Sequence, residues 1–386
     1  MKKVIIVDRV FPDYRKAVFD SLSEKVNLKV LSGKNNSGIK SISTIYSEII
    51  PTIKYGKKET AILLFPLLKI LKYLPKIVIC DFALGFLNLP FILLACKFVG
   101  IRFVFWSHGY NRKAGFEPER KWKDKYRLFL LKLADANILY GEPDKALLKK
   151  YLSGEKLFVA QNTVDTPKLT RIREDLEKEG KQKVKTKLKI GHVYNIIFVS
   201  RLLALKQPEL LINVYEILKC KYNKIVGVHY VGDGEMLQII KREVDLKSYN
   251  NDFYFHGAIH NDYLNGELLF VSDIMVNPGY LGLSINHAFC FDCPVVTFKE
   301  KNGFPAHSPE IEYLINNETG FVLEEHSPEA IALSINTLLS NDALKENFKC
   351  NIRQTVKTVF PLEKMVDGII DCIDYLQPGT NSYTCI

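Results

Sequence analysis

Short apolar runs with the character of buried strands alternate with helical patterns along almost the whole chain. The first set starts with KKVIIVD at the N-terminus and continues through KIVICD and RFVFWSHG. A second set starts with YNIIFVS and continues through IVGVHYVGDG, DIMVNPG and CPVVTF. Such alternation predicts right-handed β-α-β units, and therefore parallel sheets covered by helices on both faces.

A charged segment separates the two sets. Residues 166–189 carry many charges and lack a core-forming pattern, and the 386-residue chain is more than twice the roughly 150 residues usual for one domain. We therefore predict an N-terminal Rossmann-like domain over 1–165, a charged linker over 166–189 and a second Rossmann-like domain over 190–357. The remaining residues, 358–386, are expected to form a helix able to cross back to the first domain, followed by a frayed tail. Open α/β sheets bind ligands outside the carboxyl ends of their strands, so the expected site is the cleft between the domains.

Composition indicates a cytoplasmic protein. The chain is 47% hydrophobic and 25% charged, and no apolar run approaches the roughly 20 residues that span a bilayer, so no transmembrane helix is expected. Asp8 and Arg9 make the first apolar run too short for a signal peptide. Apart from Cys290 and Cys293, the eight cysteines lack paired spacing, which suits reduced thiols. The net charge of +10 favours anionic partners such as nucleotide phosphates, acidic lipid surfaces or nucleic acid, without choosing among them.

The common glycine-rich nucleotide-binding loops are absent from the sequence. The turn after the first strand-like run reads VDRVFPDYRK, which is not the G-x-G-x-x-G of a dinucleotide-binding domain, and there is no P-loop. VGDGE at 231–235 has two glycines but no third, and we expect it to be a tight turn. A nucleotide would have to be bound differently.

Two loops of the second set suit an anionic ligand. FVSRLLALKQPELL places Arg201 and Lys206 between a buried strand and a helix, and two cations at a strand's carboxyl end fit a diphosphate. Taken alone, two solvated surface charges are an equally good interpretation. The loop NPGYLGLS at 277–284 directs backbone amides and the positive end of a helix towards an anion.

Several segments together resemble one enzyme family. VSRLLALKQPELLI, VHYVGDGEML, FYFHGAI, SDIMVNPGYLGLSINHAFCFDCPVVTF and PEIEYLINNETGFVL are similar, in order and spacing, to the donor-binding domain of retaining GT-B glycosyltransferases of family-four type. FVFWSHGYN resembles the family's tryptophan-x-histidine-glycine segment, and VAQNTVDT its asparagine-containing strand end. The resemblance implies the GT-B fold, in which two doubly wound Rossmann-like domains face each other across a cleft.

The resemblance also implies roles for particular residues. Arg201 and Lys206 would bind the donor diphosphate, and His108 would project into the cleft as a hydrogen-bond donor to sugar or phosphate, although a structural role for His108 is the alternative. Two backbone segments would complete the donor site: the amides of Gly282, Leu283 and Ser284 at the distal phosphate or sugar, and the loop of Gly257, Ala258 and Ile259 at the nucleobase. Catalysis would then rest on positioning and charge stabilisation, with a nucleotide-diphosphate sugar as co-substrate and neither metal nor other cofactor.

The chain departs from the family at a pair of glutamates that usually stand eight positions apart. Gly279 and His287 take their places. His287 is able to hydrogen-bond a ribose hydroxyl, or it is an ordinary helix histidine. Glu310 or Glu312 would replace the sugar-side carboxylate, or nothing does. G-L-S-x-x-H-A resembles a variant of polysaccharide-synthesis members, and an inactive or altered-donor protein is the alternative.

Two segments of the first domain are candidates for the acceptor side. The stretch 54–76 places six leucines near one helical face with lysines around it: Leu63, Leu64, Leu67, Leu68, Leu71 and Leu74. Residues 111–135 are basic with interleaved aromatic residues. These patterns suit an anionic membrane that carries a lipid-diphosphate acceptor, while a core-facing helix with a solvated rim is the alternative. No nucleic-acid-binding module is visible.

We therefore predict an enzyme that moves a sugar from a nucleotide-diphosphate sugar to a hydroxyl of a glycan or lipid-linked glycan, with retention at the anomeric carbon. Assembly of bacterial capsule, O-antigen or exopolysaccharide, at the inner face of the cell membrane, is the expected setting. Two alternatives remain: a sugar-nucleotide epimerase on the same fold, and a non-catalytic nucleotide-sugar-binding partner.

Overall fold

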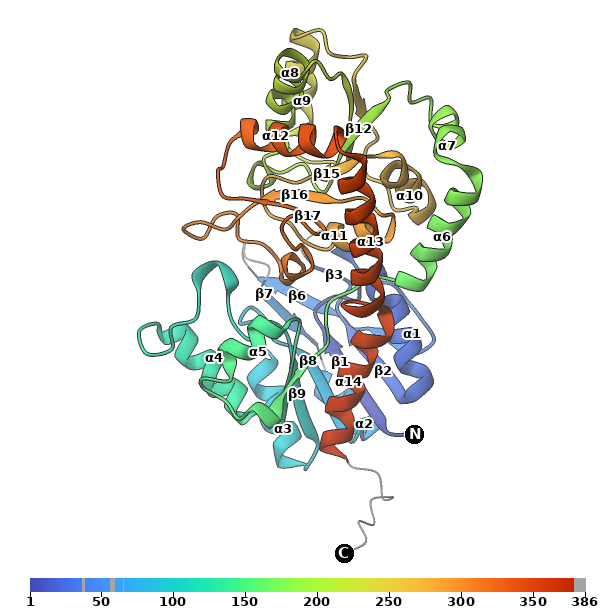
Figure 1. Ribbon diagram of the computed structural model, residues 1–386. Coiled ribbons are helices and arrows are strands. Elements are labelled where there is room, and N and C mark those ends of the chain that lie inside the picture. Colours follow the sequence, from blue (N-terminus) through green and yellow to red (C-terminus); the bar gives the residue numbers. More distant parts are fainter. Residues whose placement is uncertain (37–38, 56–59, 65, 378–386) are drawn as a thin grey trace, which may run out of the picture. The chain divides into compact units, whose positions relative to one another are not determined.

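The computed structural model describes residues 1–36, 39–55, 60–64 and 66–377 and divides the chain into two compact units (Figure 1). Unit 1 combines Met1–Val164 with the segment from Leu362 onward, and unit 2 is Asp165–Pro361. Each unit contains one parallel sheet with helices on both faces. The predicted fold class, two doubly wound Rossmann-like α/β domains, is confirmed.

The sheet of unit 1 has seven strands in the order β11-β10-β9-β8-β1-β2-β5, and every neighbouring pair is parallel. Its strands are β1 (Lys3–Asp8), β2 (Asn27–Ser32), β5 (Ser47–Ile49), β8 (Ile77–Asp81), β9 (Arg102–Trp106), β10 (Ala136–Leu139) and β11 (Leu157–Val159). The sheet grows in one direction from β1 through β2 and in the other through β8, so a topological switch point lies between β1 and β8.

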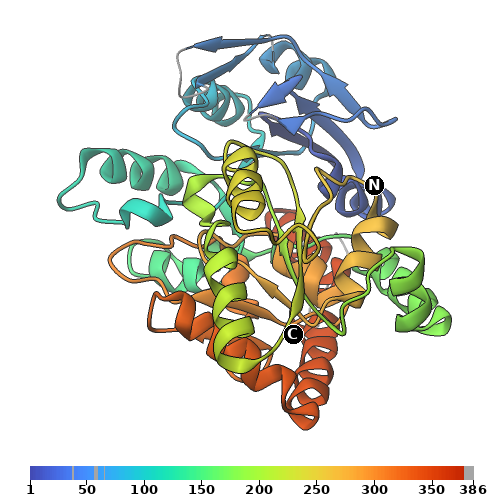
Figure 2. The same cartoon turned by 90° about the horizontal axis from the view of Figure 1, so that it is seen from above.

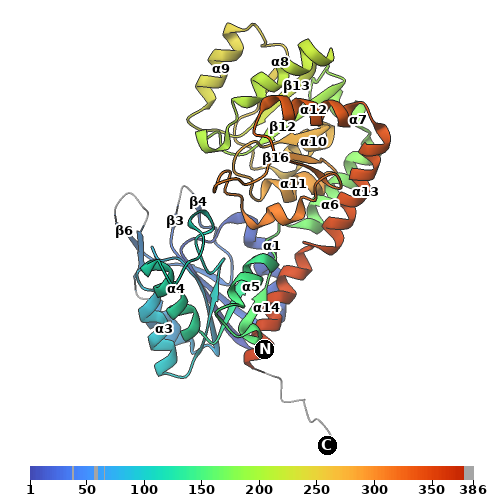
Figure 3. The same cartoon turned by 60° about the vertical axis from the view of Figure 1, so that its left-hand side comes forward.

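Two helix layers cover this sheet (Figures 1 and 2). One core cluster lies beneath α2 (Pro66–Tyr73), α3 (Leu89–Phe98), α4 (Trp122–Leu133) and α5 (Glu142–Leu148). The other lies beneath α1 (Lys16–Lys25) and the C-terminal helix α14 (Leu362–Leu376), which pack against each other (Figure 3). Small antiparallel pairs add β3 (Asn35–Asn36) with β4 (Ile39–Lys40) and β6 (Thr52–Tyr55) with β7 (Thr60–Leu63).

The C-terminal helix belongs to unit 1 because its apolar side chains complete that core. Met365, Ile369 and Cys372 of α14 are buried in one cluster with residues of β1 and α1. Gly368 allows the close approach, since a Cβ there would lie 2.0 Å from the carbonyl oxygen of Val159. The helix expected over 358–386 is therefore α14, and it lies with the N-terminal part of the chain.

The leucine-rich stretch folds differently from the single helix that the sequence suggests. Residues 60–63 form β7, and α2 begins only at Pro66. Leu63 is buried in the core, whereas Leu68, Leu71 and Leu74 are exposed. Pro66 explains the boundary, because a proline is tolerated at the first turn of a helix and disrupts the interior.

Unit 2 has a six-stranded sheet in the order β14-β13-β12-β15-β16-β17, again parallel throughout. Its strands are β12 (Tyr194–Val199), β13 (Val226–Val231), β14 (Phe253–Phe255), β15 (Ile274–Val276), β16 (Val295–Phe298) and β17 (Gly320–Leu323). Six helices follow in the same unit: α8 (Leu210–Tyr222), α9 (Leu237–Leu246), α10 (Asp262–Val271), α11 (Ser284–Cys290), α12 (Pro328–Leu339) and α13 (Asp342–Thr358). Its switch point lies between β12 and β15.

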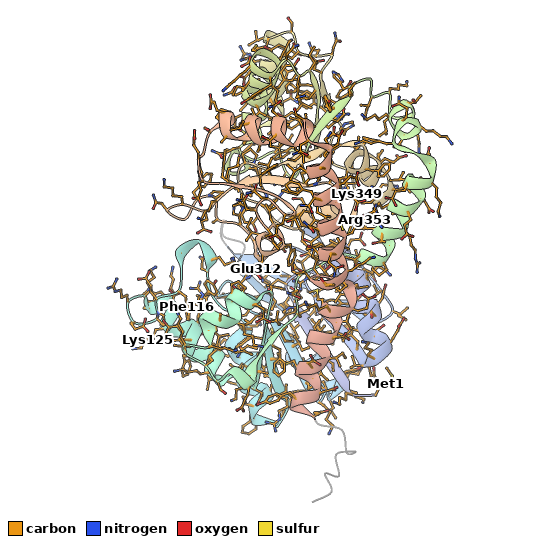
Figure 4. All side chains as sticks on the ribbon, in the orientation of Figure 1. Met1, Phe116, Lys125, Glu312, Lys349 and Arg353 are labelled. Atoms are coloured by element: carbon orange, nitrogen blue, oxygen red, sulfur yellow. The ribbon has the colours of Figure 1, made fainter. Side chains whose placement is uncertain are left out.

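The prediction of a linker over 166–189 is wrong in its local structure. This segment forms α6 (Thr166–Glu179) and α7 (Lys181–Lys187) within unit 2. Leu169 and Leu176 are buried two turns apart on α6, so a narrow apolar stripe exists beneath the charges. The charges pair with the rest of the unit: Arg353, which projects from α13 near Lys349 in Figure 4, binds Asp292 and also contacts Glu177 of α6.

Short 3-10 turns complete the described structure. They are η1 (Asp13–Arg15), η2 (Arg112–Ala114), η3 (Gly154–Lys156), η4 (Ala204–Lys206) and η5 (Pro309–Tyr313). Of these, η4 and η5 position residues of the candidate site in unit 2.

Candidate functional site

The loops after β12 and β15 meet at the switch point of unit 2. β12 and β15 are parallel neighbours, so the segment after Val199 and the segment after Val276 leave the same edge of the sheet. These are the two segments in which sequence analysis placed Arg201, Lys206 and the Gly282–Ser284 amides. A switch point is where open α/β sheets bind their ligands.

Gly279 allows the two loops to touch. A Cβ at Gly279 would lie 2.3 Å from the carbonyl oxygen of Leu205 and 2.6 Å from the Cα of Lys206. Two backbone hydrogen bonds join the loops there, from Gly279 N to the Lys206 carbonyl at 3.1 Å and from Tyr280 N to the Leu205 carbonyl at 3.3 Å. A glutamate at position 279 has no room in this arrangement.

Lys206 is the cation that this contact places at the site. Its side chain is buried, its ammonium lies 4.2 Å from the centroid of the Tyr280 ring, and it donates a hydrogen bond to the Tyr280 carbonyl oxygen. An ammonium over an aromatic face is attracted by the ring's quadrupole. Lys206 is therefore held beside the loop that leads into α11.

Arg201 occupies a different environment two residues after β12. Its side chain is exposed, and within the described residues its guanidinium makes no hydrogen bond or ion pair. The backbone around it is fixed by the VGDGE turn, because a Cβ at Gly232 would lie 1.9 Å from the Ser200 carbonyl oxygen and Leu202 N donates to the Asp233 carbonyl at 2.9 Å. The expected tight turn thus supports the loop that carries Arg201.

The loop before α11 is held from below by His307 and Ser308. Leu281 N donates to His307 Nδ1 at 3.1 Å, and His307 Nε2 donates to the Phe298 carbonyl at 2.8 Å, which fixes the tautomer of this buried histidine. Ser308 Oγ is hydrogen-bonded to the Tyr280 hydroxyl. Gly282, Leu283 and Ser284, each half-buried, follow directly and begin α11. No sequence motif marks His307 and Ser308, whose only signal is their place in AHSPE.

His287 lies half-buried in the last turn of α11. Within the described residues its Nδ1 is buried without a hydrogen-bond partner, and burial lowers the pKa of the imidazole although Asp262 opposes the shift. The ring is therefore neutral at neutral pH. It is able to offer Nδ1 as either a donor or an acceptor.

Glu310 and Glu312 lie on η5. This turn directly follows His307 and Ser308, which hydrogen-bond the loop that carries Tyr280. Glu310 is buried and follows Ser308 by two residues, and Glu312, which is labelled in Figure 4, is half-buried. Burial, and then the charges of Glu310 and Glu312, raise the pKa of the Tyr313 hydroxyl. Of the two candidates, Glu310 is nearer in the chain to the loop that carries Gly279.

The loop of Gly257, Ala258 and Ile259 follows β14 at the far edge of the sheet. Gly257 has a φ of 68° and its carbonyl accepts a hydrogen bond from Gly232 N at 2.8 Å. Ala258 is exposed and Ile259 is half-buried. The VGDGE turn therefore connects the loop predicted for the nucleobase with the loop that carries Arg201.

His108 lies in unit 1, directly after β9. Its Nδ1 is 3.1 Å from Oδ2 of Asp144, and its ring packs edge-on against Tyr140 with the centroids 4.9 Å apart. Asp144 is fully buried and also accepts hydrogen bonds from the Tyr110 hydroxyl at 2.9 Å and the Arg112 guanidinium at 3.0 Å. Because a carboxylate only accepts, Nδ1 of His108 carries a proton and a neutral ring presents Nε2 as an acceptor.

A second buried network occupies the switch point of unit 1. Arg9 Nε is 2.6 Å from Asp81 Oδ2, and Arg15 Nη1 is 3.2 Å from Asp8 Oδ2. Burial, reinforced by the charge of Asp81, raises the pKa of Asp8 to about 6, while Arg15 and Arg9 oppose the shift. Arg15 also donates to the Tyr140 hydroxyl at 2.5 Å, so this network reaches the ring that packs on His108. No local motif marks this network, because bonded members such as Arg15 and Tyr140 lie as many as 125 positions apart.

The described residues offer neither a candidate metal cluster nor a candidate membrane span. Across the described ranges, no group of three or more His, Cys, Asp or Glu side chains is arranged to hold a metal ion. Cys290 and Cys293 are both buried free thiols. Across the same ranges, none of the helices combines the length and the apolar character required to cross a bilayer.

Comparison with known proteins connects this geometry with an enzyme class. Residues 180–355 match the family model of glycosyl transferases group 1. An uncharacterized glycosyltransferase of Methanocaldococcus jannaschii is 25% identical over 291 residues, which are 72% of this chain and 69% of that protein. Poly(ribitol-phosphate) alpha-N-acetylglucosaminyltransferase of Staphylococcus aureus is 26% identical over 180 residues, 46% of this chain, and the match spans only 34% of that longer protein.

Solved structures agree on the fold. The Anabaena protein HepE, solved in complex with UDP, superposes with a TM-score of 0.69 over 97% of this chain and 100% of its own, at 15% sequence identity. At 15% identity, this similarity shows the fold alone.

Proposed function

We propose that this glycosyltransferase of group 1 type, with the GT-B fold, moves a hexosyl group from a nucleoside-diphosphate sugar to a hydroxyl of a glycan or lipid-linked glycan, with retention at the anomeric carbon. The observation that carries the proposal is the contact between Lys206 and Tyr280, which fixes a buried ammonium at the loop that leads into the Gly282–Ser284 segment. HepE, which has the same fold, was solved with UDP, and the Staphylococcus relative transfers N-acetylglucosamine to a poly(ribitol-phosphate).

The departing diphosphate requires positive charge more than covalent chemistry. When the bond between the anomeric carbon and the phosphate oxygen breaks, negative charge builds on the diphosphate, and preorganised cations stabilise it. Lys206 offers a fixed charge and Arg201 an exposed, bidentate donor, while the amides that begin α11 add partial positive charge. We propose that these groups act without a metal ion.

The remaining predicted residues orient the substrates. His108, oriented by Asp144, would accept a hydrogen bond from a sugar hydroxyl at Nε2, in place of the donor role expected from the sequence. His287 would contact the ribose, Glu310 would stand in for the missing sugar-side carboxylate, and the loop Gly257–Ile259 would face the base. An acceptor in surface-polysaccharide assembly, used on the cytoplasmic side of a membrane, is part of the same proposal.

Transfer is tested by incubating the full chain with nucleotide sugars and a panel of glycan and polyprenyl-diphosphate acceptors, and separating the products. Lys206→Ala should reduce turnover by about 10²- to 10³-fold, as expected for the loss of one preorganised charge stabiliser. Lys183→Ala is the matched control, because Lys183 is an exposed lysine of the same unit on α7. Equal turnover of the two variants would reject the proposed site.

A non-catalytic nucleotide-sugar-binding protein is the second candidate, favoured by one observation. Gly279 leaves no space for the family's usual carboxylate at that position. Such a protein would bind a nucleotide sugar but would neither hydrolyse it nor transfer its sugar to any acceptor. Lys206→Ala would then weaken nucleotide-sugar binding and change no reaction rate. An epimerase on the same fold would instead convert the donor with no acceptor present.

A further inference from the structure

Helix α3 of unit 1 exposes a stripe of large apolar side chains. Phe91 is 69% exposed, Leu94 58% and Phe98 92%, and they follow one another at intervals of three and four residues along one face of the helix. The opposite face, with Ile92, Leu93 and Cys96, is buried in the core. No sequence pattern singled out this outer stripe, since α3 is apolar on both faces.

The neighbouring helices of the same layer continue this apolar surface. Trp122, which is 72% exposed, and Phe129 project from α4, and Leu68 and Leu71 from α2. α2 contacts α3, and Lys97 of α3 is 2.8 Å from Asp135 just beyond α4, where the two helices lie side by side in Figures 1 and 3. All three helices cover one face of the sheet, so their exposed stripes lie on the outside of one layer.

Positive charge accompanies these apolar side chains. Residues 66–76, 87–99 and 120–133 contain ten lysines and arginines and a single acidic residue, Asp124. Asp124 is buried and paired with Arg127, and carboxylates outside these ranges pair with Lys69, Lys97 and Lys121. The other six cations leave the surface positively charged: Lys72, Lys76, Arg120, Lys123, Lys125 and Lys132. Exposed cations lie between and beside the aromatic residues of α4, notably Lys123, Lys125 and Lys132.

We infer that the outer face of α2, α3 and α4, called here the α2–α4 surface, docks on a phospholipid bilayer with anionic headgroups. Aromatic and leucine side chains insert at the boundary between headgroups and acyl chains, while lysines and arginines bind the negative surface. A second copy of the chain is a poor occupant, because two such surfaces would bring like charges together. The inference gives the membrane contact of the proposed function a location, but it rests on this surface alone and not on sugar transfer.

Vesicle flotation with the full chain tests the inference. We expect the protein to float with vesicles of phosphatidylglycerol and phosphatidylcholine in equal parts, and to remain unbound with phosphatidylcholine alone. Phe98→Ser with Trp122→Ser should abolish flotation through loss of insertion, and Lys123→Glu with Lys125→Glu should weaken it by about tenfold or more through loss of charge.

Matched variants on unit 2 control for general effects. Val193→Ser with Leu246→Ser removes two apolar side chains that are also largely exposed, and Lys183→Glu with Lys357→Glu reverses two exposed charges. These variants should float like the parent protein, and thermal unfolding should show that all variants are folded. The inference is overturned if the parent does not bind anionic vesicles, if it binds neutral ones equally well, or if the α2–α4 variants float as well as their controls. A surface that mediates self-association instead would appear as a larger mass in light scattering, lost in Phe98→Ser with Trp122→Ser, without vesicle binding.

Discussion

The ammonium of Lys206 lies 4.2 Å from the centre of the Tyr280 ring and is hydrogen-bonded to the carbonyl oxygen of the same residue. Two loops that are more than seventy positions apart in sequence thereby become one structure at the carboxyl edge of the unit 2 sheet. In the proposed function, this pair binds the charged part of the donor.

Removal of the Tyr280 ring should therefore weaken donor binding without deleting any charge. Tyr280→Leu eliminates both the cation-π contact and the hydroxyl that bonds Ser308, whereas Tyr280→Phe keeps the first and loses the second. We expect Tyr280→Leu to lose about 1 to 2 kcal/mol of donor-binding free energy, and Tyr280→Phe to lose less. Isothermal titration with UDP and UDP-sugars measures both. Equal losses for the two variants would show that the hydroxyl, not the ring, positions Lys206.

Gly279→Ala should destabilise the fold as well as the site. Its Cβ would collide with the backbone of Leu205 and Lys206, so the two loops must separate at a cost of about 1 to 3 kcal/mol. Urea unfolding measures the free-energy change, and donor titration measures the accompanying loss of affinity. Gly191→Ala is the control, because a Cβ there meets nothing within 4 Å. Equal stability of the two alanine variants would contradict the close approach described here.

Asp144→Asn should change the protonation pattern of His108. The amide nitrogen of asparagine is able to donate to Nδ1, which would move the ring proton to Nε2 and remove the acceptor that the native ring presents. Turnover is expected to fall by roughly tenfold, with a nearly unchanged donor KM. Nitrogen NMR of the histidine ring reports the tautomer directly. Tyr110→Phe, which removes a different partner of Asp144, should leave that tautomer unchanged.

Stability should fall as the pH decreases below 6.5. Burial, followed by the charges of neighbouring groups, lowers the pKa of His229 to about 3 from its ordinary 6.5, so the unfolded chain takes up a proton that the folded state excludes. This stabilisation is fully present above pH 6.5 and is lost progressively as the pH falls towards 3. By about pH 4 the loss in unfolding free energy is about 3 kcal/mol. His256 and His287, whose pKa values burial also lowers, add in the same direction.

The comparison variant for this titration is His229→Gln, which cannot take up the proton. Its unfolding free energy, measured with urea across the same pH range, should depend less steeply on pH than that of the parent protein. Parallel curves for the two proteins would show that another group dominates the acid loss.

Sequence patterns predicted the fold because each buried strand is a short local signal. KVIIVD and YNIIFV identify themselves through uninterrupted apolar residues, and their order determines the β-α-β connections. The segment of α6 was predicted to be a linker because its many charged residues outnumber its buried leucines, Leu169 and Leu176. The charges belong to ion pairs with distant residues, such as Arg173 with Asp292, which no local pattern reveals.

The candidate site was predictable only where function depends on consecutive residues. Lys206 and the loop before α11 were identified from local motifs, and their contact is present; their role in donor binding stays a prediction. His307 and Asp144 were missed because each acts through a partner 26 or 36 positions away, and an isolated histidine or aspartate in a loop has no distinguishing pattern. The sequence marked Gly279 only as a position where a glutamate was expected. The close contact at Gly279 was not predictable, because the backbone that crowds it belongs to another loop.

The place of α14 in unit 1 has a consequence for biosynthesis. A ribosome releases residues 1–164 well before Leu362, so the sheet face that α14 covers stays uncovered while the whole of unit 2, which is continuous in sequence, emerges and is able to fold. Unit 1 is thus begun first and completed last. Until α14 is synthesised, the apolar sheet face that it covers is exposed and open to contact with other molecules in the cell.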